Sequence, residues 1–149
     1  MSKEKIDQLP KNSIEAQGLL IKAFYEKYGD DILPIVDDIL GLQGCSLGLR
    51  VKKKLSDNRL STVAGAFSEN FDQNSAEVVV LSDEKFHIRG KKCPFGIENT
   101  SRKLCEAVMA IDREYFSAAT GGKTKLTILQ TRAAGDPLCD TIYTVAGEK

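Results

Sequence analysis

The spacing of the apolar residues changes once along this chain, close to Asn74 and Ser75. Before this point, apolar residues recur at intervals of three and four, which is the period of amphipathic helices. After it, residues 77–81 are mostly β-branched and residues 86–89 alternate between apolar and polar, which is typical of strands. The sequence therefore predicts a helical half followed by a half that contains a sheet.

Residues 1–12 are polar, so they are expected to form a flexible leader before a single domain over residues 13–149. The first helix is predicted to begin at the Asn12 cap and to end at Gly29. A second helix should follow with Pro34 in its first turn, where the missing N–H has no helical partner to lose.

Two glycines, Gly41 and Gly44, are expected to loosen or end that second helix. Apolar residues at spacing four then predict a third helix over residues 45–56, with its basic run facing solvent. A fourth helix is predicted over about residues 59–71, where leucine, valine and phenylalanine share one face.

The second half is predicted to have the order β–β–α–β–β. Its helix is expected to start at the caps of residues 99–101 and to run to about residue 119. The predicted strands cover residues 77–81, 86–89, 125–132 and 139–145. Together with the N-terminal helices, this order predicts an α+β domain with a mainly antiparallel sheet covered by helices.

Composition narrows the classes of function. The chain has 149 residues with 21 basic and 21 acidic side chains, so its net charge is zero, which argues against nucleic-acid binding. No run approaches the roughly 20 apolar residues that span a bilayer, and the N-terminus lacks the apolar core of a signal peptide. We therefore expect a cytoplasmic domain, with a small molecule as partner rather than nucleic acid or a membrane.

Cysteines are the chemically distinctive residues of this chain. Cys93 ends a predicted strand, Cys105 lies in the predicted helix, and Cys139 opens the last strand, so one compact sheet-plus-helix unit can bring them together. Three thiolates are a typical ligand set for zinc or for three corners of an iron–sulfur cluster, with Cys45 as fourth ligand if the helical half folds back. The alternative is that these cysteines are ordinary core residues.

His87 is the only histidine, and it lies in a predicted strand. A metal-free cysteine nucleophile would need His87 as its base, while the simpler interpretation is a strand histidine with a structural partner.

Short motifs around these cysteines resemble a known family. They are Cys93-Pro94, Leu104-Cys105, the Gly-Asp-x-x-Cys hairpin that ends at Cys139, and the Tyr-Gly-Asp-Asp stretch at residues 28–31. The sequence resembles the L-2-amino-thiazoline-4-carboxylic acid hydrolase-like family and, more remotely, the 4-vinyl reductase (hydrocarbon-binding) domain. The resemblance implies a small-molecule pocket between helices and sheet, and a site that includes all three cysteines. Residues 132–134 depart from the 4-vinyl reductase pattern, which has another cysteine there.

These observations predict a small-molecule-binding domain of sensor or ligand-carrier type with a cysteine-based metal site. Aromatic residues that include Tyr115 are candidates for lining its apolar pocket. The alternative that the resemblance implies is a hydrolase acting on the C–N bond of a cyclic amidine-like acid such as 2-aminothiazoline carboxylate. Asp136 or Glu106 would then be the base and Arg132 would bind the substrate carboxylate. A third hypothesis is a homodimer or partner-binding module built from the helical half, and whether the chain is an enzyme stays open.

Overall fold

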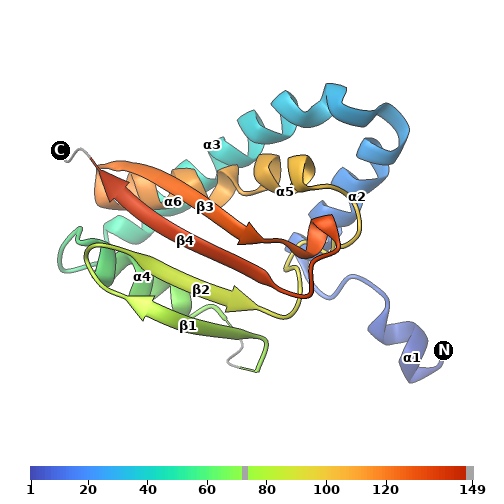
Figure 1. Ribbon diagram of the computed structural model, residues 1–149, viewed down its shortest axis with the longest axis horizontal. Helices are drawn as coiled ribbons and strands as arrows, with labels where there is room; N and C mark the ends of the chain where they lie inside the picture. The colour runs from blue at the N-terminus through green and yellow to red at the C-terminus, as the bar shows by residue number, and fades with distance from the viewer. Residues whose placement is uncertain (72–73, 147–149) are drawn as a thin grey trace.

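A computed structural model describes residues 1–71 and 74–146 of the chain (Figure 1). The elements follow in the order α1 (Lys3–Asp7), α2 (Ser13–Tyr28), the 3-10 helix η1 (Gly29–Ile32), α3 (Leu33–Lys52), α4 (Leu60–Ser68), β1 (Ala76–Leu81), β2 (Phe86–Gly90), α5 (Arg102–Val108), α6 (Ala110–Thr120), β3 (Lys123–Gln130), the 3-10 helix η2 (Arg132–Ala134) and β4 (Cys139–Ala146). The predicted α+β class is confirmed, and the predicted caps at Asn12 and Ser101 each accept a hydrogen bond from a backbone N–H of the first helical turn.

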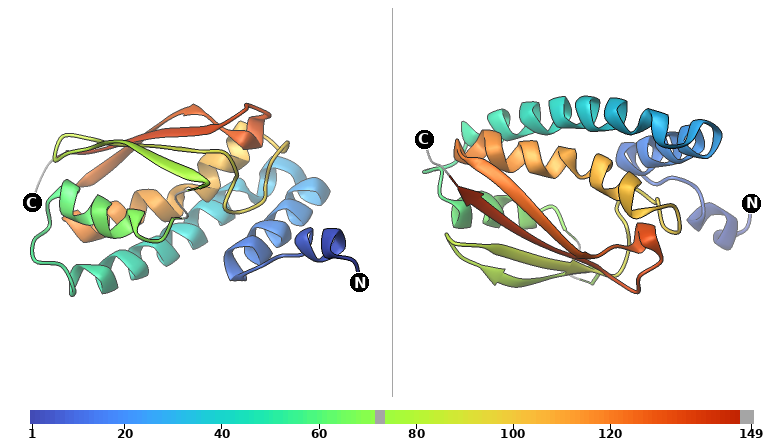
Figure 2. Two further views of the ribbon diagram at one scale, coloured as in Figure 1. Left: turned by 90° about the horizontal axis from the view of Figure 1, so that it is seen from below. Right: turned by 45° about the horizontal axis from the view of Figure 1, so that its top comes forward.

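The four strands form one antiparallel sheet in the order β1-β2-β4-β3. One face of this sheet is covered by α4, which packs on β1 and β2, and by α6, which packs on β3 and β4. Helix α3 packs against α6 on the side away from the sheet, so the domain has three layers, as Figure 2 shows from below.

Two groups of buried residues hold these layers together. An aromatic cluster lies between α4, α6 and the sheet, where the Phe67 ring contacts those of Phe86, Phe116 and Tyr143 at centroid distances of 4.9 to 6.2 Å. A second, mainly aliphatic cluster lies between α2, α3 and α5, and Cys93 and Cys105 pack against its edge. The thiols therefore sit where the helical half meets the sheet.

The predicted second and third helices are a single helix, α3, so the interpretation of Gly41 and Gly44 as helix breakers is wrong. Gly44 lies on the buried face of α3, and a Cβ there would be 2.0 Å from the carbonyl oxygen of Ile111 on α6. A Cβ on Gly48 would likewise be 2.4 Å from the carbonyl oxygen of Tyr115. Glycine is needed because the two helices approach closely, and this packing outweighs the roughly 1 kcal/mol that each glycine costs a helix.

The long helix predicted up to residue 119 is divided into α5 and α6 at Met109. Neither proline nor glycine stands at the division. The Met109 N–H donates to the Cys105 carbonyl at 2.8 Å, and the Met109 carbonyl accepts from the Arg113 N–H at 3.0 Å, so α6 follows α5 directly.

The predicted leader contains the short helix α1, none of whose residues is buried. In Figure 2, α1 stands apart from the three layers. The stretch 13–52, which contains α2, η1 and α3, is long and apolar enough to cross a membrane by length and composition alone, and one such stretch is weak evidence of a span.

Candidate functional site

Three thiols lie close together where β2, α5 and β4 meet. Strand pairing brings Gly90 at the end of β2 beside Cys139 at the start of β4, and the loop after β2 carries Cys93. The charges of Cys93 and Cys139 both raise the pKa of the Cys105 thiol, and the charge of Cys139 raises the pKa of the Cys93 thiol. All three side chains are partly exposed, so this thiol cluster is accessible from solvent.

Burial keeps these thiols protonated. It raises the pKa of Cys105 to about 11, and it also raises the pKa of Cys93 and of Cys139. Hydrogen bonds to the sulfurs oppose this effect without overcoming it, including one from the Thr131 hydroxyl to Cys105 and one from the backbone N–H of Arg132 to Cys139. At neutral pH the cluster is therefore a set of neutral thiols, which are weak nucleophiles.

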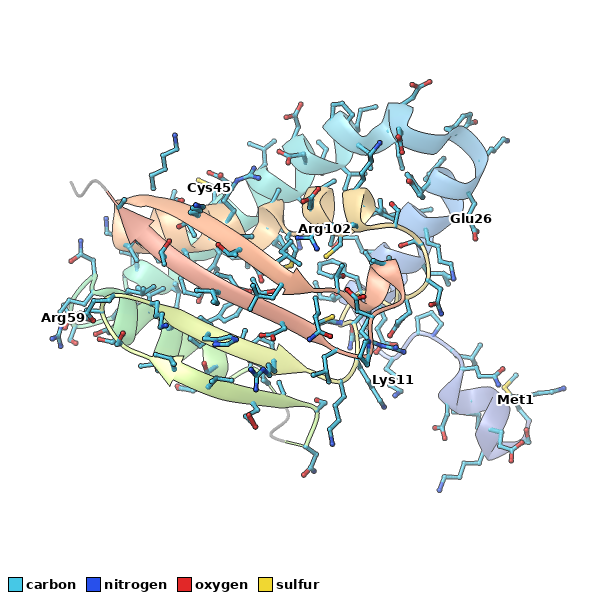
Figure 3. The ribbon with its side chains drawn as sticks, viewed as in Figure 1. Met1, Lys11, Glu26, Cys45, Arg59 and Arg102 are labelled. Carbon is cyan, nitrogen blue, oxygen red and sulfur yellow. The ribbon has the colours of Figure 1, made fainter. Side chains whose placement is uncertain are left out.

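The predicted metal site has no support among the described residues. Within residues 1–71 and 74–146, no group of three or more His, Cys, Asp or Glu side chains is placed to hold a metal ion. Cys45 is not among the groups that shift the pKa of the three thiols, and Figure 3 shows it on α3, well away from η2. Zinc, an iron–sulfur cluster and the zinc-dependent hydrolase therefore stay predictions.

Arg132 holds an unusual position in the turn between β3 and β4. Its Nη1 donates to the carbonyl oxygen of Asp136 at 3.2 Å, but its Nε is buried and has no hydrogen-bond partner. In the part of the chain that the structure describes, it is the sole buried side-chain nitrogen or oxygen in this condition. Native proteins rarely leave such a donor unpaired, so this atom is where an external acceptor would be expected.

Asp136, the predicted base, has a structural partner. Its Oδ2 accepts a hydrogen bond from the backbone N–H of Thr131 at 2.9 Å, which closes the β3–β4 turn and fixes the Arg132 backbone. Glu106, the other candidate base, is exposed and lies 3.6 Å from the Arg102 guanidinium across one helical turn. Asp136 also raises the pKa of the Cys139 thiol through its charge.

Two acidic residues of this region were not found from the sequence. Glu98 accepts a hydrogen bond from the backbone N–H of Cys93 at 3.1 Å, and its charge raises the pKa of both Cys93 and Cys139. Asp112 accepts a 2.6 Å hydrogen bond from the Tyr143 hydroxyl, and burial raises the pKa of Asp112 to about 6. The charges of Cys105 and Cys139 both raise the pKa of Tyr143, so the Asp112–Tyr143 pair lies beside the thiol cluster.

Tyr115 lies in the aromatic cluster rather than beside the thiols. Its ring is 5.3 Å from that of Phe67 and 5.5 Å from that of Phe116, and the residue is 9% exposed. A role for Tyr115 in ligand binding stays a prediction.

His87 is paired elsewhere. Its Nε2 lies 2.5 Å from Oδ1 of Asp140, whose other oxygen accepts from Nε of Arg89 at 3.3 Å. Asp140 directly follows Cys139 in β4, so their side chains point to opposite faces of the sheet. His87 is therefore hydrogen-bonded to a buried carboxylate on the outer face of the sheet and is not placed as a base for Cys139.

An open groove of about 550 Å³ lies between the start of α3 and the α5–α6 helices. Charges of both signs line it, and its residues are Leu33, Pro34, Asp37, Asp38, Lys103, Glu106, Ala107 and Arg113. The Arg113 guanidinium spans it to reach Asp37 at 3.0 Å, so this groove is held by ion pairs.

No family model and no curated protein sequence matches this chain. Among solved structures, a trafficking protein particle complex subunit 3 from Naegleria fowleri, covalently bound to palmitic acid, is similar with a TM-score of 0.58 and 12% identity, over 91% of this chain and 96% of its own. The phenol-responsive sensory domain of the transcription activator PoxR, solved with phenol, gives a TM-score of 0.46 and 13% identity, over 90% and 75%. Both neighbours have small α+β folds, and the family resemblance stays a prediction.

Proposed function

We propose that this chain is a small-molecule-binding domain whose ligand contacts Arg132 and the thiols of Cys93, Cys105 and Cys139. The observation that carries the proposal is the buried, unpartnered Nε of Arg132. Leaving a buried donor unpaired costs about 1–3 kcal/mol, and more when the group is charged. An acceptor oxygen brought by a ligand removes that cost, so binding gains the same amount.

The surroundings of Arg132 indicate the chemistry of the ligand. Neutral thiols and the aliphatic cluster against which Cys93 and Cys105 pack favour an apolar body. The guanidinium favours a carboxylate or another oxygen acceptor at one end. An apolar acid has both parts, and the structural neighbour from Naegleria fowleri carries palmitic acid, which is of this kind.

Noncovalent binding is expected here. A thioester forms only after a thiolate attacks, and burial raises the pKa of Cys105 to about 11. The ligand should therefore leave when the protein is denatured, and the mass of the denatured chain should be unchanged.

The test is a titration of the whole chain with palmitic acid, followed by native mass spectrometry and calorimetry. Arg132→Gln removes the charge and leaves a shorter polar side chain, and it is expected to weaken binding about tenfold to a hundredfold, as one lost charge-assisted hydrogen bond would. Arg50→Gln, an exposed arginine on α3, is the matched control and should bind like the unaltered chain. Equal affinity in the Arg132 and Arg50 variants, or no binding at all, would contradict the proposal.

A metal on the same thiols is a separate proposal, supported only by their closeness. Zinc or an iron–sulfur cluster would require Cys93, Cys105 and Cys139 to lose their protons and to turn toward one point. Elemental analysis of protein purified without oxygen tests it, and Cys93→Ala should then lower the bound metal.

A further inference from the structure

Helix α3 is apolar on two opposite faces. One face is buried against α6 through residues such as Val36, Leu40 and Gly44. The other face carries Ile35 and Leu42, which are 64% and 69% exposed. A helix that is apolar all round is normally buried on all sides, so half of the apolar surface of α3 lacks a partner in the single chain.

The exposed residues form one continuous stripe. Ile35, Ile39, Leu42, Ser46 and Leu49 follow one another at spacings of four and three, which places them in a line along the helix. From first to last the stripe is about 21 Å long at a rise of 1.5 Å per residue. In Figure 2, α3 forms the outer edge of the molecule, and no other element lies over this side of it.

The charges beside this α3 stripe differ between its two ends. The exposed Asp31 and Asp38 stand at the N-terminal end, where Asp30 and Asp37 already pair with Lys103 and Arg113 of the same chain, and no basic residue occurs from residue 29 to residue 49. The C-terminal end has Arg50 and the lysines of residues 52–54, and no acidic residue occurs from residue 39 to residue 56. The stripe is therefore complementary to a copy of itself that runs in the opposite direction.

We propose that a second copy of this chain covers the α3 stripe, with the two α3 helices antiparallel about a two-fold axis close to Leu42. Leu42 lies midway between Ile35 and Leu49, so this axis places each end of one stripe over the opposite end of the other. The acidic end of each helix then faces the basic end of its partner, as an isologous interface requires.

A lipid surface is the less suitable occupant. Helices that lie on membranes carry basic residues along their polar face, because the lipid surface is negative. The acidic half of α3 would be repelled there, whereas it is matched by the basic end of a second α3. The charge pattern thus favours self-association.

Sedimentation equilibrium of the full chain over a wide range of concentration is the test. The unaltered chain should reach twice its mass of 16.3 kDa. Leu42→Arg places two like charges at the axis and should weaken dimerisation about 100-fold or more, with the circular dichroism spectrum unchanged because Leu42 is exposed. Leu129→Arg, at a 49% exposed leucine of β3, is the matched control and should remain dimeric. A monomeric unaltered chain, or a dimer that survives Leu42→Arg, would overturn the proposal.

Orientation is tested by oxidative cross-linking in a Cys45→Ser background. Leu42→Cys should form a disulfide across the axis, whereas Ile35→Cys should not, because antiparallel helices hold the two Ile35 positions about 21 Å apart along the axis. Cross-linking through Ile35→Cys would show parallel helices and contradict the arrangement. Co-sedimentation of a monomeric chain with vesicles that contain phosphatidylserine would show that lipid, not a second copy, covers the stripe.

Discussion

The protein is expected to lose stability as the pH rises from about 4 to about 6. Replacing Asp112 by asparagine should remove this loss. Burial raises the pKa of Asp112 from 3.8 to about 6, and the Tyr143 hydroxyl reduces this effect only in part. Within this window the folded chain holds a proton that the unfolded chain has released. The free energy of unfolding therefore falls as the pH rises through the window, and the loss is complete above about pH 6.

The magnitude follows from the difference between the two pKa values. A shift of about two units corresponds to about 3 kcal/mol, because each unit is worth 1.36 kcal/mol. Asparagine has no charge to bury, and its amide oxygen can still accept from the Tyr143 hydroxyl. Asp112→Asn should therefore be more stable than the unaltered chain by up to about 3 kcal/mol at pH 7 and about equally stable at pH 4.

Urea unfolding of both proteins at a series of pH values measures this difference directly. Asp7→Asn, at an exposed position of α1, removes the same charge without burial and serves as the control. Its difference from the unaltered chain should be small and nearly independent of pH. If the Asp112→Asn difference is the same at pH 4 as at pH 7, the carboxylate is not held in the interior as described.

Two further predictions concern the helix packing and the thiols. Gly44→Ala should destabilise the chain by about 1–3 kcal/mol in a thermal unfolding assay, since the new methyl group would meet the Ile111 carbonyl. Gly65 has open space around it, so Gly65→Ala should stabilise the chain by about 0.5–1 kcal/mol in the same assay. Equal effects of the two substitutions would contradict the close approach of α3 and α6. Alkylation of Cys105 by iodoacetamide, followed by peptide mass spectrometry, should accelerate roughly tenfold per pH unit up to about pH 10, because its pKa is about 11. A rate that levels off near pH 8 would be incompatible with a buried thiol.

The sequence predicted correctly those elements that depend on residues close to one another in the chain. The cap at Asn12, the change of period near residue 75 and the strands β1, β2 and β4 were all expected from the sequence, within one or two residues. Gly44 was misread because its role is to let α6 approach. A single sequence does not distinguish a glycine that ends a helix from a glycine that allows a second helix to pack closely against the first.

The site was predictable only in part. Its cysteines stand out by chemistry, and their positions at the ends of elements indicated that they meet. Glu98 carries no such signal, because an acidic residue in a loop is usually exposed. The clue for Asp112 was its place in a helix between Val108 and Tyr115, both on the apolar face. The unpartnered Nε of Arg132 depends on the folded turn and could not be read from residue spacing.

The proposed function rests on a ligand that supplies the acceptor Arg132 Nε lacks. Its most direct test is the Nε–Hε signal of Arg132 in a nitrogen–proton correlation spectrum, assigned with the Arg132→Gln variant and followed during titration with palmitic acid. This signal should move downfield and become protected from exchange as the acid binds, while the Arg50 signal does not change. An Arg132 signal that stays in place while palmitic acid binds would show that the ligand does not contact Nε.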